Sequence, residues 1–82
     1  MTISGNTVNT NGGDGIYARG GANISGNTVT GNDGYGSTSA YPPTSAFREN
    51  VITSNTKGTV TGGVNLGANY CAGTGVISAS CP

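Results

Sequence analysis

Apolar residues and asparagines follow one another in a pattern that returns four times along the chain. The first copy reads Ile3-x-x-Asn6-x-Val8-x-x-Asn11. The other copies are Ile24-x-x-Asn27-x-Val29-x-x-Asn32, Phe47-x-x-Asn50-x-Ile52-x-x-Asn55 and a weaker Leu66-x-x-Asn69-x-Cys71-x-x-Thr74. The first asparagines of successive copies are separated by 21, 23 and 19 residues. A period near 20 residues with one such strip per unit predicts a solenoid.

Each strip suits a short β-strand, because β-branched residues alternate with polar ones, as in Asn6-Thr7-Val8-Asn9. Glycine and asparagine bracket the strips and favour tight turns. Glycine also interrupts every segment that could form a helix. We therefore predict an all-β solenoid of three to four coils without α-helix. The coils are expected near residues 3–23, 24–46, 47–65 and 66–82 of a single domain.

The second coil departs from the pattern over residues 33–46. This segment contains Asp33-Gly34-Tyr35-Gly36 and Tyr41-Pro42-Pro43 among small polar residues. Proline and glycine at this density predict a loop that bulges from the coil. Such loops carry function more often than the scaffold beneath them.

The asparagines of the repeat are expected to have a structural role. If the coils superpose, the first asparagines of the copies stack in a column. A side-chain amide both donates and accepts hydrogen bonds, so stacked amides can form a ladder. The predicted ladder consists of Asn6, Asn27, Asn50 and Asn69.

Composition explains why a repeat is needed. The 82 residues include 16 glycines, one Phe and no Trp, and only 33% are hydrophobic. An ordinary fold of this size and composition would bury too little apolar surface, whereas a coil buries small side chains against its neighbours. The repeat begins directly after Met1, so we expect a fragment of a longer chain. Its open end would be covered by missing N-terminal coils or by another subunit.

The charge balance excludes several partners. Three basic and three acidic side chains give a net charge of zero. Nucleic-acid surfaces and polybasic membrane patches need clustered Lys and Arg. No apolar run approaches the roughly 20 residues of a transmembrane helix, and no signal peptide is expected in this chain.

The coil sequence resembles a known superfamily. Ile-Ser-Gly-Asn-Thr-Val followed by Asn-Gly-Gly-Asp-Gly-Ile is similar to the consensus of right-handed parallel β-helix proteins, the pectate-lyase-like superfamily. Its members include pectate lyases, polygalacturonases, alginate epimerases, phage tailspikes and adhesins. The end of the chain, from Gly63 to Pro82, looks like the closing coil of secreted bacterial members. The resemblance implies C-terminal coils of an extracellular or cell-surface protein. Leucine-rich and hexapeptide repeats do not fit, because the chain has one Leu and irregular steps.

Candidate chemistry is sparse. The chain has no histidine, which excludes histidine-based catalysis and metal sites. In related polysaccharide lyases, acidic side chains on neighbouring coils hold Ca²⁺ or a sugar acid, and a basic residue abstracts a proton. By that resemblance, Asp14 and Asp33 are candidate metal ligands, and they are candidate catalytic residues together with Arg48 and Lys57. Two carboxylates are too few for a complete calcium shell. A turn role for Asp14 and a solubilising role for the basic residues stay open as alternatives.

Other side chains suggest binding or covalent stabilisation. Tyr35 and Tyr41 could stack on sugar rings or pack the loop onto the coil. Cys71 and Cys81 are the only cysteines, and a disulfide between them would close the last turn in an oxidising compartment. A flat threonine face could bind ice, but the column that starts with Thr7 and Thr28 continues as Val51 and Tyr70.

The sequence thus leads to a structural or carbohydrate-facing β-helix segment of a secreted or cell-surface protein, with no catalysis of its own and with polysaccharide as the expected partner. A lyase or epimerase acting on acidic polysaccharide is the alternative, and an ice-binding solenoid is a third interpretation.

Overall fold

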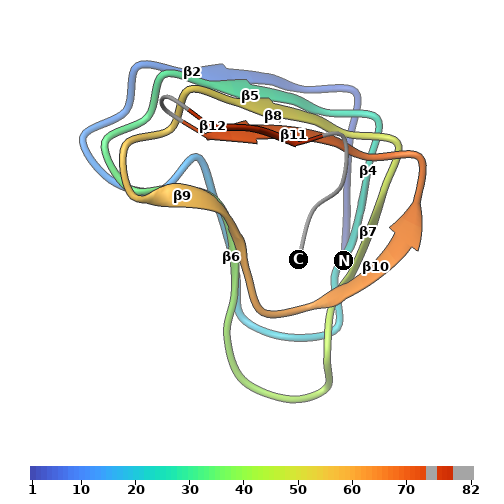
Figure 1. Cartoon of the computed structure of the whole chain (residues 1–82). Helices are drawn as coiled ribbons and strands as arrows, with labels where there is room; N and C mark the ends of the chain where they lie inside the picture. Colours follow the sequence, from blue (N-terminus) through green and yellow to red (C-terminus); the bar gives the residue numbers. More distant parts are fainter. Residues whose placement is uncertain (74–75, 79–82) are drawn as a thin grey trace.

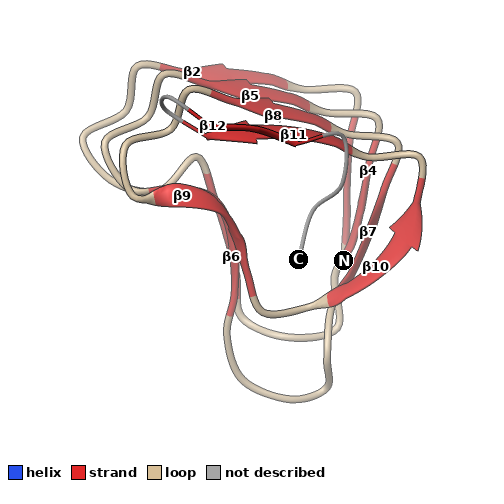
Figure 2. Ribbon diagram, in the orientation of Figure 1, coloured by secondary structure: helices blue, strands red, loops and turns tan. Residues whose placement is uncertain are grey.

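The computed structural model describes residues 1–73 and 76–78, and the side chains of residues 1–72. The described residues form short strands and no helix, arranged in three sheets (Figures 1 and 2). Sheet A contains β1 (Thr2–Ser4), β4 (Asn23–Ser25), β7 (Ala46–Arg48) and β10 (Val64–Gly67). Sheet B contains β2 (Thr7–Asn9), β5 (Thr28–Thr30), β8 (Val51–Thr53), β11 (Tyr70–Gly73) and β12 (Val76–Ser78). Sheet C contains β3 (Ile16–Ala18), β6 (Tyr35–Ser39) and β9 (Gly58–Thr61).

The chain visits sheets A, B and C in turn and then returns to sheet A one coil further on. Equivalent strands of successive coils pair in parallel, for example β2 with β5 and β5 with β8. In Figure 1 the path from β4 through β5 to β6 runs counter-clockwise while later coils come toward the viewer. This is a right-handed coil, the hand that parallel crossovers adopt. The predicted right-handed parallel β-helix is therefore confirmed; only β12, which pairs antiparallel with β11, departs from it.

The core is a set of short apolar columns that run along the axis. Ile24 and Phe47 stack above Ile3 on sheet A, and both are fully buried. On sheet B, Val29, Ile52 and Cys71 stack above Val8. Because each side chain packs on its equivalent in the next coil, a chain without large hydrophobic residues still forms a closed interior.

Two details differ from the sequence prediction. Much of the segment predicted as a loop over residues 33–46 is strand β6, which pairs with β3 and β9, so the loop is confined to residues 40–45. In this coil Ser37 replaces the apolar residue that Ile16 and Val60 provide, which hides the strand from a hydrophobic pattern. Leu66, aligned with Phe47 by the repeat, is 56% exposed, because a bulge in β10 pairs Asn65 with Phe47 instead.

The corner between sheets A and B is held by a ladder of four asparagine side chains. The amide Nδ2 of Asn6, Asn27 and Asn50 donates to Oδ1 of the next asparagine at 3.1, 3.0 and 2.9 Å. The ladder ends at Asn69. Each accepting Oδ1 also receives the backbone N–H of the preceding asparagine, at 3.0 Å throughout. The second Nδ2 hydrogen is also used: that of Asn27, for example, is donated to the carbonyl of Ile3. Each buried corner therefore satisfies its own polar groups.

A second ladder, which the sequence prediction omitted, holds the corner between sheets B and C. Nδ2 of Asn11 donates to Oδ1 of Asn32 at 2.9 Å, and Nδ2 of Asn32 donates to Oδ1 of Asn55 at 2.8 Å. Backbone N–H groups join the same oxygens. Asn32 and Asn55 are 0% and 1% exposed, so these amides belong to the core.

We expect Asn27→Ala to destabilise the protein by on the order of 3 kcal/mol, because it leaves several buried donors and acceptors unpaired. Asn6→Ala is the matched control: Asn6 is exposed and removes one donor, so it should cost about 1 kcal/mol. Equilibrium urea unfolding measures both values. Equal losses for the two variants would contradict the structural role of the buried ladder.

Candidate functional site

The corner between sheets C and A is the one corner of the described coils that lacks an asparagine ladder, and its length varies. Four residues (19–22) connect β3 to β4, six (40–45) connect β6 to β7, and two (62–63) connect β9 to β10. The loop of the second coil therefore projects beyond its neighbours, as the long lower loop in Figure 1 shows. A projecting loop beside a short connection creates a step in the surface.

This step forms a hollow of about 240 Å³. Its lining residues are Ser39, Tyr41, Pro42, Thr44, Ser45 and Gly63. Ser45 is 1% exposed, and its Oγ accepts the N–H of Ala22 at 3.1 Å, which leaves its own hydroxyl hydrogen to donate. The hollow thus combines hydroxyl groups with the apolar faces of Pro42 and Tyr41.

Strand β6, at the base of the loop, carries unusual polar groups. The buried hydroxyl oxygens of Ser37, Thr38 and Ser39 have no hydrogen-bond partner among the described residues. Unpaired buried hydroxyls cost free energy, so a strand chosen for packing alone would carry apolar residues here. Their grouping beside the hollow sets β6 apart from the equivalent strands β3 and β9.

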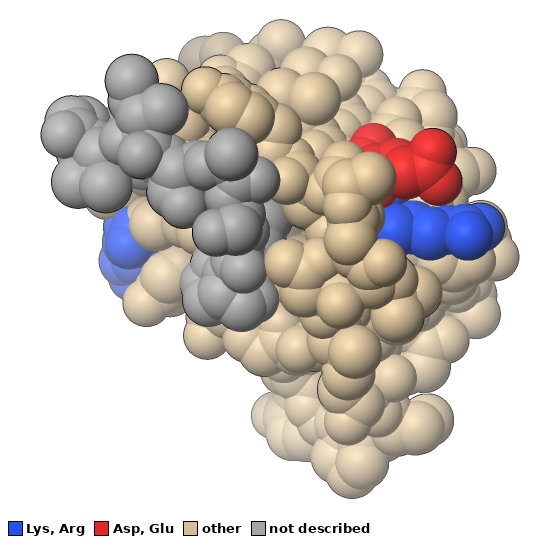
Figure 3. Space-filling view, turned by 45° about the vertical axis from the view of Figure 1, so that its right-hand side comes forward, with Lys and Arg blue, Asp and Glu red and all other residues tan. Residues whose placement is uncertain are grey.

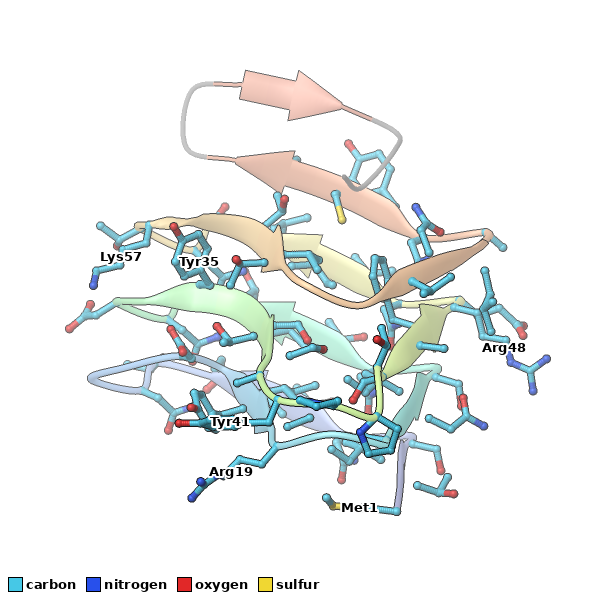
Figure 4. The ribbon with its side chains drawn as sticks, turned by 90° about the horizontal axis from the view of Figure 1, so that it is seen from below. Met1, Arg19, Tyr35, Tyr41, Arg48 and Lys57 are labelled. Atoms are coloured by element: carbon cyan, nitrogen blue, oxygen red, sulfur yellow. The ribbon has the colours of Figure 1, made fainter. Side chains whose placement is uncertain are left out.

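Tyr41 stands at the rim of the hollow and is held from below by the first coil. Its side chain is 62% exposed, and the guanidinium carbon of Arg19 lies 4.7 Å from the ring centroid. This distance is typical of a cation–π contact. Figure 4 shows Arg19 beneath Tyr41. The N–H of Gly21 donates to the carbonyl of Pro43 at 2.6 Å, which ties the loop to the first coil.

Gly20 lets the loop come close, because a Cβ at Gly20 would lie 2.8 Å from the carbonyl oxygen of Pro42. Tyr17, the second exposed aromatic residue of this region, is 54% exposed and pairs with Thr38 on sheet C.

Tyr35 has a different role. Its ring carbon Cε1 lies 3.1 Å from the position of a Cβ at Gly58, so the ring packs on the next coil where glycine leaves room. Tyr35 is half-buried. It therefore packs β6 onto β9 and is not a free aromatic platform.

The two aspartates lie at the corner between sheets B and C. Oδ1 of Asp14 accepts the backbone N–H of Tyr35 at 2.8 Å, which joins the first coil to the second. Asp33 is exposed, and its backbone N–H donates to the carbonyl of Asn11. No cluster of three or more metal-ligating Asp, Glu, Cys or His side chains occurs in the described part of the chain.

The basic candidates are separated from each other. Arg48 lies on sheet A and Lys57 follows β8, and Figure 4 places them on opposite sides of the molecule. Arg48 forms a 3.8 Å ion pair with Glu49, but both side chains are more than half exposed, so the pair contributes little. The charged groups in Figure 3 are correspondingly scattered over an otherwise uncharged surface. The four catalytic candidates are therefore not gathered at one site.

The outer face of sheet B follows the columns expected from the repeat. Thr7 and Thr28 are followed by Val51 and Tyr70. In the neighbouring column, the hydroxyls of Thr30 and Thr53 lie 3.2 Å apart. The threonine array is thus interrupted within two coils.

Sequence reasoning identified Tyr41 but missed the residues that support it. Arg19 precedes Tyr41 by 22 residues, which is one coil. A search for side chains one period apart would have paired them. The hydroxyls of Ser39 and Ser45 give no such signal, because small polar residues occur throughout the chain.

Comparisons with protein-family models, with curated proteins and with solved structures find no match for this chain. Likeness to the β-helix superfamily therefore stands at the level of architecture. No helix in the described part is long and apolar enough to span a membrane.

Asp14→Ala should lower stability by about 1–3 kcal/mol, because the Tyr35 N–H loses its acceptor. The exposed Asp33→Ala is the control and should stay within about 0.5 kcal/mol of wild type. Thermal unfolding with and without added Ca²⁺ separates this structural role from a metal site. A Ca²⁺-dependent rise in Tm that both substitutions abolish would instead establish calcium binding.

Cys71 is 1% exposed at the inner face of the last coil, and Cys81 lies outside the described residues. The disulfide between them remains a prediction from the sequence. We expect mass spectrometry after alkylation without reduction to find no free thiol in protein prepared under oxidising conditions. Reduction should then lower stability by about 2–3 kcal/mol. Alkylation of both cysteines in unreduced protein would refute the pairing.

Proposed function

We propose that this chain is a non-catalytic, carbohydrate-facing segment of a secreted or cell-surface β-helix protein, similar to the pectate-lyase-like superfamily. A polysaccharide is its ligand, and the hollow beside loop 40–45 is where one sugar residue binds. The proposal rests chiefly on Tyr41, an exposed ring braced by Arg19 at the rim of a hydroxyl-lined hollow.

The chemistry of a sugar ring suits this surface. A pyranose has an apolar C–H face and a rim of hydroxyls that both donate and accept hydrogen bonds. The Tyr41 ring offers an apolar face of fixed orientation. Ser39, Thr44 and Ser45 line the hollow with hydroxyl groups that can pair with the sugar rim.

The size of the hollow favours a polymer over an enclosed small molecule. Its volume of about 240 Å³ is below the roughly 300–1,000 Å³ of typical ligand pockets. A single sugar residue of a longer chain fits such a hollow, while the rest of the polymer continues across the surface. Arg19 is the basic group at this position, and its guanidinium could pair with the carboxylate of an acidic sugar.

The absence of catalysis in this proposal is supported by geometry. An acid–base mechanism needs the proton-transferring groups within hydrogen-bond reach of one substrate. Arg48 and Lys57 lie on opposite sides of the molecule, and Asp14 is engaged with the backbone. No observation on the described residues favours a lyase, an epimerase or an ice-binding surface over carbohydrate binding.

Tyr41→Ala should weaken polysaccharide binding about three- to tenfold, the loss expected for one aromatic contact. Affinity gel electrophoresis against neutral and acidic polysaccharides measures this change, and it reports binding without requiring turnover. Tyr70→Ala is the matched control, since Tyr70 is exposed on sheet B and away from loop 40–45.

Equal weakening by Tyr41→Ala and Tyr70→Ala would place the binding surface elsewhere. Retardation of neither the wild type nor the variants by any of the polysaccharides would overturn the proposed function. Cleavage of the polymer by the wild-type chain would identify it as an enzyme.

A further inference from the structure

The asparagine ladders have a direction. In each step, the Nδ2 and backbone N–H of one coil donate to Oδ1 of the following coil. The same order holds at the second corner. Each coil therefore presents donors toward the last coil and acceptors toward the first coil, so the two ends of the stack are chemically different.

The donor end is closed by the chain itself. Asn69 is the last member of the first ladder, and its Nδ2 donates to Oδ1 of Asn65 at 2.9 Å. Asn65 lies in the bulge of β10 and thereby supplies the oxygen that the asparagine of a further coil would supply. On sheet B, β12 pairs with the edge of β11.

The acceptor end is open. Within the described residues, no donor reaches Oδ1 of Asn6 or Asn11, whereas their counterparts Asn27 and Asn32 each accept two hydrogen bonds. Ile3 and Val8 are only partly buried, although the residues stacked on them are 0% exposed. The edges of β1, β2 and β3 have no partner strand on this side.

These groups define what can cover the first coil. The occupant must offer an N–H and an amide Nδ2 to Asn6, and the same pair to Asn11. It must also place apolar side chains over Ile3 and Val8 and align parallel strands about 4.8 Å below β1 and β2. An asparagine-bearing coil seen from its donor side satisfies all of these conditions, because the coil-to-coil contact inside this protein is built in the same way.

A second copy of the chain does not satisfy them. Packed head to tail, its donor at Asn69 is already bound by Asn65. Packed with its own first coil facing ours across a two-fold axis, it would present the Oδ1 acceptors of Asn6 and Asn11 to the same acceptors. Two facing carbonyl-type oxygens repel and leave both unpaired.

We propose that the first coil is a docking surface for the uncapped donor side of another β-solenoid coil, with an asparagine at each of two corners. The two ladders set the polarity and register of the contact, and the columns of Ile3 and Val8 supply its apolar part. This inference is independent of carbohydrate binding, because it concerns different corners and a different end of the molecule.

The test extends the stack by one coil. A copy of residues 2–22 is inserted directly before Thr2, which preserves the native connection because Asn23 is the coil equivalent of Thr2. We expect Tm to rise by about 5 °C or more, as Asn6 and Asn11 become internal. Hydrogen exchange of their side-chain amides, followed by NMR, should slow at least tenfold.

The matched control carries Asp in the inserted copy at the positions copied from Asn6 and Asn11. Aspartate keeps the shape but replaces the Nδ2 donor by a second oxygen, so at pH 7 the gain in Tm should vanish. An equal gain for both insertions, or no gain and no slowed exchange for the asparagine insertion, would overturn the proposal.

Sedimentation of the unextended chain tests the second copy as occupant. We expect a monomer across micromolar concentrations. A dimer in which β1 and β2 become protected from hydrogen exchange as concentration rises would also overturn the proposal.

Discussion

The structure depends on how a side-chain amide satisfies the polar groups of a buried turn. At each ladder corner, one Oδ1 accepts two donors from the preceding coil, and one Nδ2 reaches both the next Oδ1 and a backbone carbonyl. Asparagine alone has this short reach with donor and acceptor on one group. The corner then needs no water and no large apolar residue, so strands of three or four residues can stack into a stable coil.

Because the ladders constrain two corners, variation is confined to the third. The corner between sheets A and B has two residues in every described coil, and the spacing from Asn11 to Ile16 recurs from Asn32 to Ser37 and from Asn55 to Val60. Only the corner between sheets C and A changes length, and the hollow, Tyr41 and Arg19 all lie there. The scaffold thus separates stability from binding, because insertions at this corner break no ladder hydrogen bond.

The sequence indicated most of the scaffold and little of the site. The columns that begin with Ile3, Asn6 and Val8 recur because each coil must present the same groups to the next, and this demand is visible in one sequence. Strand β6 was missed because Ser37 fills an apolar position, and Leu66 was misplaced because a bulge shifts the register of β10. At the site, Tyr41 was noted for its loop, but its support by Arg19 depends on a contact that occurs once.

The sequence by itself therefore determined the fold class, the stacking columns and the scarcity of catalytic groups, since these follow from repeated chemistry and composition. The tertiary structure decided where the non-repeating residues meet. It joined Arg19 to Tyr41, attached Asp14 to the backbone of Tyr35, and placed Asn65 at the end of the first ladder. The physical reason is that such contacts depend on the lengths of individual connections and on local bulges, which a period averages away, whereas ladders and apolar columns are set by the period itself.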